Sequence, residues 1–110
     1  MIRRTFAIAG SVVLCTTLTV VLTAAQKGDA AKGKQVFEQC AMCHNIDSPE
    51  KKMGPSLQHL FQHKVLANGK PVNDANVLAQ INAGGNGMPP YGDTLSAEDK
   101  ANLMAYLHTL

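Results

Sequence analysis

A stretch near the start of the polar part of the chain has the spacing of an amphipathic helix. Asp29 is a good N-cap residue, and behind it lie Gly33, Val36, Phe37 and Cys40. Their spacing of i, i+3, i+4 and i+7 places all four on one face. We therefore expect a helix that begins after Asp29 and ends at the cysteine.

The C-terminal stretch "LSAEDKANLMAYLHTL" predicts a second helix. Ser96 is its N-cap and acidic residues follow in the first turn, where they complement the helix dipole. Its apolar stripe consists of Leu103, Tyr106, Leu107 and Leu110. We expect the apolar faces of the two helices to pack against each other. Gly33 would let the helices approach closely.

The middle of the chain predicts two shorter helices and an irregular loop. We expect helices over Ser56 to Lys64 and over Asn73 to Ala83. The segment "GGNGMPPYGD" at 84–93 must be a loop because glycine and proline dominate it. No strand pattern or repeat is found, so the sequence predicts an all-α fold.

The first 25 residues have the pattern of an export signal. Arg3 and Arg4 are followed by an apolar run from Phe6 to Leu22 and by the small residues "TAA". We expect cleavage near Ala25, which divides the chain into a signal peptide, 1–25, and one domain, 26–110. The alternative is an uncleaved anchor that holds the protein at the inner membrane, although several threonines and a serine weaken it as a span.

Loss of the signal changes the charge balance. Without Arg3 and Arg4, eight Lys and Arg face eight Asp and Glu, in a chain that is 45% apolar and 16% charged. A nucleic-acid-binding protein needs a clustered positive surplus. The sequence has none, so we expect no nucleic-acid partner.

Two cysteines then remain, Cys40 and Cys43, with His44 directly behind them. With His59 and His63 they approach the spacing of a Cys2His2 zinc site, but the cysteines end a helix and the interval is polar. A thioredoxin-like redox pair would need a βαβ pattern, which is missing. A disulfide would close too small a loop to stabilise the fold much.

A haem attachment site accounts for Cys40, Cys43 and His44 together. Two thiols about one helical turn apart can each form a thioether with one of the two vinyl groups of haem, and the next residue offers an imidazole to the iron. A second axial ligand is then needed. Met88, in the glycine-rich loop, is the best candidate, while Met42, Met53 and Met104 are better explained as packing residues.

The motifs "GKQVFEQCAMCH", "GPSL", "GNGMPPYG" and "LSAEDKANLMAYL", in this order, resemble the class I c-type cytochromes, especially small bacterial monohaem members. The resemblance implies a helical fold around one covalent haem c and places Gly33 and Phe37 against the last helix near Tyr106. It implies thioethers at Cys40 and Cys43, His44 as the proximal ligand, and Met88 as the distal ligand. The Pro55 carbonyl would accept a hydrogen bond from the His44 ring. His59 and His63 lie where small or apolar residues are expected, so they are rival ligands.

The resemblance implies a periplasmic one-electron carrier rather than an enzyme. We expect a monomer that exchanges electrons with larger redox proteins. Two alternatives remain: an electron-relay subunit of a dehydrogenase or oxidase complex, and a haem enzyme or sensor with an open sixth site.

Overall fold

The computed structural model describes residue 10 and residues 27–110. Apart from residue 10, the predicted signal segment 1–25 lies outside the described residues. Within residues 27–110 four helical elements follow one another: α1 (Ala30–Phe37), the 3-10 helix η1 (Leu60–Gln62), α2 (Asp74–Ala83) and α3 (Ala97–Leu107). The described residues contain isolated β-bridges but no strand, which confirms the predicted all-α class.

The N-terminus of α1 is capped and attached to α3. The Asp29 carboxylate accepts hydrogen bonds from the backbone N–H groups of Ala31 and Lys32, as its N-cap role predicts. The Asp29 N–H donates in turn to Oδ1 of Asn102, over 2.8 Å. Asn102 is buried, so this bond satisfies a polar group inside the contact between the two helices.

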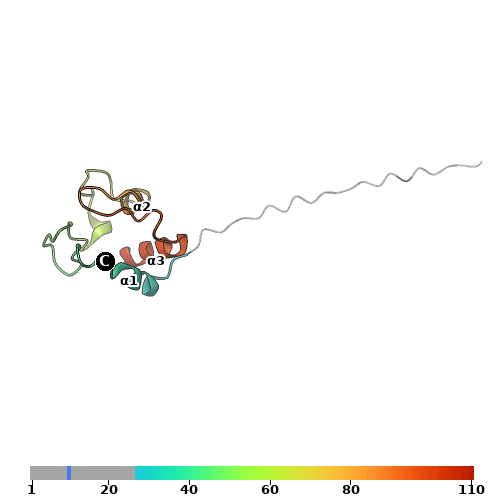
Figure 1. The fold of residues 1–110 in the computed structure, drawn as a ribbon, viewed down its shortest axis with the longest axis horizontal. Coiled ribbons are helices and arrows are strands. Elements are labelled where there is room, and N and C mark those ends of the chain that lie inside the picture. The colour runs from blue at the N-terminus through green and yellow to red at the C-terminus, as the bar shows by residue number, and fades with distance from the viewer. Residues whose placement is uncertain (1–9, 11–26) are drawn as a thin grey trace, which may run out of the picture.

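Helix α1 crosses α3 at Gly33, and the two helices lie against each other in Figure 1. A Cβ atom at Gly33 would lie 1.9 Å from the backbone oxygen of Asn102 and 2.7 Å from Cβ of Tyr106. Only glycine permits this approach. One turn further along, the ring of Phe37 packs on that of Tyr106 with 5.4 Å between centroids, which confirms the predicted pairing.

Helices α2 and α3 each begin at a side-chain cap, of which the one at Ser96 was predicted. The Asn73 side chain accepts from the N–H of Asn76, and Ser96 Oγ accepts from the N–H of Asp99. Both helices therefore start where the sequence predicts. The segment 84–93 that connects them has no helix, also as predicted.

The predicted helix over Ser56 to Lys64 is wrong, because only the three residues of η1 are helical there. Ser56 Oγ accepts a hydrogen bond from the N–H of Gln58, a local turn that competes with helix formation. His59 then has φ 54°, in the left-handed region. A continuous helix cannot form through these residues, and extended backbone at His63 ends η1.

His108, the residue that caps the end of α3, forms contacts with other elements of the fold. Its Nε2 lies 2.5 Å from the Asp74 carboxylate at the start of α2. Its ring also stacks on Phe61 of η1, with centroids 3.7 Å apart. The end of α3 is therefore joined to two other helical elements.

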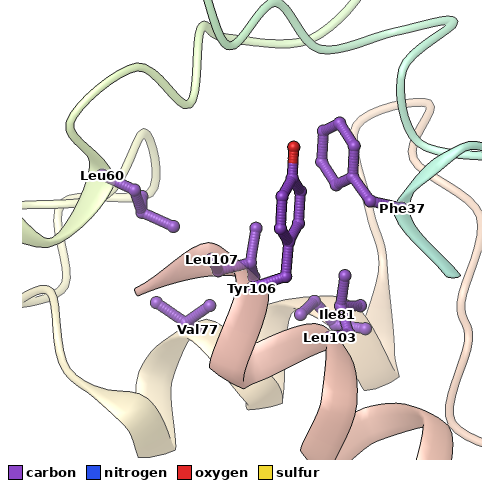
Figure 2. Close-up of a cluster of buried hydrophobic side chains, with 7 residues drawn as sticks. All are labelled: Phe37, Leu60, Val77, Ile81, Leu103, Tyr106 and Leu107. Carbon is purple, nitrogen blue, oxygen red and sulfur yellow. The ribbon is translucent and has the colours of Figure 1, made fainter. Parts of the chain in front are cut away.

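The hydrophobic core of the described residues is small. Figure 2 shows its side chains, which come from all four helical elements: Phe37, Leu60, Val77, Ile81, Leu103, Tyr106 and Leu107. The rings of Phe37 and Tyr106 lie side by side in this view, as their separation requires. Such a small core ties the helices together but leaves little apolar area to stabilise the fold.

The close crossing at Gly33 can be tested by Gly33→Ala. Although alanine favours helices by about 1 kcal/mol, the overlap with Asn102 should make the variant less stable by about 1–3 kcal/mol. Urea unfolding of the mature protein, followed by circular dichroism, measures the change. Ala31→Gly, at an exposed site of the same helix, is the control and should lose about 1 kcal/mol from propensity alone. A stabilised Gly33→Ala protein would contradict the crossing.

Candidate functional site

A cavity of about 410 Å³ lies among the connecting segments and the helices. Four of the seven buried core residues line it: Leu60, Val77, Ile81 and Leu107. Cys40, Cys43, His44, Pro55 and Met88 line it as well. Its volume falls in the range of small-molecule and cofactor sites. All five residues of the predicted site therefore meet at one cavity that borders the core.

A second hollow, of about 530 Å³, lies over α1 and α3. Its lining is mostly polar or charged, with Lys32, Glu98 and Asp99 among the residues. It is more open to solvent and contains none of the predicted site residues. Its polar and open character is that of a surface hollow between two charged helix faces.

The two cysteines lie in turns that continue from the end of α1. The N–H groups of Cys43 and His44 both donate to the carbonyl of Cys40, over 3.1 and 3.0 Å, so the three residues occupy a single turn. Both thiols are free. Burial, and secondarily the charge of Cys43, raises the pKa of the Cys40 thiol. Reactive redox cysteines have a lowered pKa, so Cys40 does not have the character of a redox thiol.

His44 is fixed from two sides. Its Nδ1 lies 2.7 Å from the carbonyl oxygen of Pro55, which leaves Nε2 as the free ring nitrogen. Gly54 packs against the ring, since a Cβ at that position would lie 2.5 Å from Cε1 of His44. The imidazole is thus oriented before any ligand binds.

Met88 is held by an unusual loop. All four residues from Gly84 to Gly87 have positive φ, between 52° and 116°. Gly85 and Met88 exchange backbone hydrogen bonds of 2.9 and 3.0 Å, and Gly84 packs directly on the carbonyl of Met88. The glycines are needed because L side chains rarely adopt these angles. The loop therefore gives Met88 a defined position beside the cavity.

The other candidate axial ligands are exposed, and most of them lie outside the cavity. His59 and His63 are exposed and do not line the cavity, and Nε2 of His63 lies 3.0 Å from the carbonyl of Gln58. Met53 does line the cavity, but it is 82% exposed and its sulfur lies 3.9 Å from that of Cys43. Met42 is 80% exposed and lies outside the lining.

Sequence reasoning missed several residues of this site. Gly54 supports His44 and precedes Pro55, so the "GPSL" motif could have identified it. Gln80 and Asn68 line the cavity and are hydrogen-bonded to each other. Nothing in their sequence context marks them, because their partners lie on other segments.

These residues fit a haem c. The cavity combines apolar walls with a pair of free thiols one turn apart, an imidazole whose second nitrogen is unbonded, and a thioether. A structural zinc site needs four ligands, and the described residues contain no group of three His, Cys, Asp or Glu side chains placed to hold a metal ion together. Apolar walls suit a large flat cofactor rather than a small ion.

Comparison with known proteins agrees with this arrangement. Residues 28–107 match the family described as cytochrome c oxidase, cbb3-type, subunit III. The chain is 31% identical over 81 residues to cytochrome c6 of Diacronema lutheri, covering 73% of this chain and 94% of that protein. It is 48% identical over 50 residues to cytochrome c2 of Blastochloris viridis, covering 44% of this chain and 39% of that one.

A solved structure supports the fold. Cytochrome c6 from the diatom Phaeodactylum tricornutum superposes with a TM-score of 0.54 and 32% identity, over 74% of this chain and 93% of that one. The family match, over residues 28–107, includes α1, the segments that line the cavity and α3. The chain therefore belongs to the class I c-type cytochromes, electron-transfer proteins that carry one covalently bound haem c.

Proposed function

We propose that the chain holds its haem c through four side chains and exchanges single electrons with redox proteins outside the cytoplasm. The four are Cys40 and Cys43 as thioethers, His44 as the proximal ligand, and Met88 as the distal ligand. The observation that supports this is the cavity, which brings Met88 together with a Cys-x-x-Cys-His segment more than forty residues away.

Haem c supplies a one-electron couple between ferric and ferrous iron. The chain's part is to keep both ligands in place in each oxidation state. The Pro55 carbonyl orients His44, and the backbone bonds at Gly85 restrain Met88. Because neither group has to move when an electron arrives, little reorganisation is needed. A filled sixth position also argues against an enzyme that binds a small substrate there.

We propose further that the protein is exported and cleaved near Ala25. The basic and apolar pattern of residues 1–25 supports this. No helix within residues 27–110 is long and apolar enough to cross a bilayer. The proposed location is the periplasm, and the protein is proposed to act as a monomer.

The second candidate function is that of a fixed electron relay in a larger complex. The family description names an oxidase subunit, which favours this candidate, whereas the relatives are named as individual cytochromes. Co-purification at a constant ratio to a membrane oxidase would select the relay. Recovery of the haem protein by itself in the periplasmic fraction would select the free carrier.

The attachment is tested by removing the thiols. Cys40→Ala and Cys43→Ala should each lower the yield of haem protein several-fold, because each thioether needs its own sulfur. The double variant should carry no covalent haem. Acid-acetone extraction followed by in-gel peroxidase staining measures this, and Met42→Ala, in the same segment, should keep full haem content. Covalent haem in the double variant would refute the attachment.

The distal ligand is tested by Met88→Ala. The oxidised wild type should show the weak near-infrared band of methionine-ligated haem, and the variant should lose it and bind carbon monoxide when reduced. Met53→Ala, at the other methionine that lines the cavity, is the control and should keep the band. A Met88→Ala protein with an unchanged band would show that another residue is the ligand.

A further inference from the structure

A chain of side-chain amides connects a surface turn to the sulfur of Met88. The backbone N–H of Lys70 donates to Oδ1 of Asn68 over 2.9 Å. Nδ2 of Asn68 donates to Oε1 of Gln80 over 3.1 Å. Nε2 of Gln80 then donates to the carbonyl of Gly84 over 3.0 Å and lies 3.9 Å from Sδ of Met88.

The two ends of this chain fix the direction of both amides. An N–H group can only donate, so the oxygen of Asn68 must face Lys70 and its nitrogen must face Gln80. A carbonyl can only accept, so the nitrogen of Gln80 must face Gly84, on the side of Met88. Rotating either amide by half a turn would place like groups against each other at both of its ends.

The two hydrogen-bonded amides lie beside the proposed haem site. Asn68 and Gln80 both line the cavity, Gln80 from the last turns of α2 and Asn68 from the segment between η1 and α2. Gln80 is half-buried, whereas Asn68 is exposed. Neither residue is needed to attach the haem or to ligate the iron, so their joint function is unassigned.

We propose that Asn68 is a positioning residue that orients the Gln80 amide with its N–H toward the Met88 sulfur, and that this orientation raises the reduction potential. The inference rests on the proposed ligation by Met88.

The sign follows from electrostatics. The N–H end of an amide dipole is positive, and the oxidised site carries one more positive charge than the reduced site. A positive dipole end beside the ligand therefore disfavours the oxidised form. The same N–H withdraws electron density from the thioether and makes it a weaker donor, which favours ferrous iron further. Reversing the amide would bring its oxygen to the sulfur and lower the potential.

The experiment is a double-mutant cycle read by the reduction potential of the mature haem protein. Gln80→Leu removes the amide and should shift the potential downward. Asn68→Ala removes one of the two hydrogen bonds that orient the amide and leaves the bond to Gly84, so it should shift the potential downward by a smaller amount. In the Gln80→Leu background Asn68→Ala should have no further effect, because no amide is left to orient.

A third variant, Asn68→Asp, keeps the hydrogen bond that residue 68 accepts from the N–H of Lys70. Asn68→Asp can still accept from Lys70 but cannot donate to Gln80, and its charge also lowers the potential. The shift should therefore be larger with Gln80 present than in the Gln80→Leu background, where charge alone acts. Should Gln80→Leu fail to mature, Gln80→Ala takes its place. Gln62→Leu, at an exposed glutamine outside the cavity, is the control and should leave the potential unchanged.

The near-infrared band separates this inference from the proposed function. A wild type without the band refutes ligation by Met88 and with it the inference. With the band present in every variant, an unchanged potential in Gln80→Leu, or equal effects of Asn68→Ala in both backgrounds, overturns the inference alone. A loss of stability without any change in potential would give Asn68 and Gln80 a structural role only.

Discussion

The backbone contact between α1 and α3 at Gly33 is the constraint on which the site depends. It sets the distance between the helices, and Phe37 then packs on Tyr106 one turn further along α1. The cysteine turns begin directly behind Phe37 through hydrogen bonds to its carbonyl. The position of the thiols and of His44 therefore follows from the packing of two helices rather than from the motif alone.

The hydrophobic core and the cavity share residues. Most of the buried hydrophobic residues border the cavity, and the half-buried Leu57 and Leu66 line it as well, so a bound haem would extend the same apolar core. A domain of this size gains only a small stability from its core, so we expect the cofactor to contribute to folding. The glycine loop before Met88 and the Pro55 carbonyl beside His44 each restrain one proposed ligand through hydrogen bonds outside the core.

The sequence predicted those parts of the fold that depend on local signals. The caps at Asp29 and Ser96 and the helix expected over Asn73 to Ala83 lie where predicted, because caps and periodicity act within a few residues. The helix over Ser56 to Lys64 was wrong because the hydroxyl of Ser56 forms a turn with the backbone of Gln58, which competes with helix formation. The roles of Asn68 and Gln80 could not be predicted, because each depends on a partner that only the tertiary fold brings near.

The central claim is that His44 and Met88 together hold the iron in both oxidation states. X-ray absorption at the iron edge of the mature protein, measured oxidised and reduced, tests it most directly. The account predicts that the iron has one sulfur neighbour in addition to nitrogen neighbours in each oxidation state. The iron–ligand distances should change little between the two states. A shell of nitrogen alone, or a sulfur neighbour found in only one oxidation state, would contradict it.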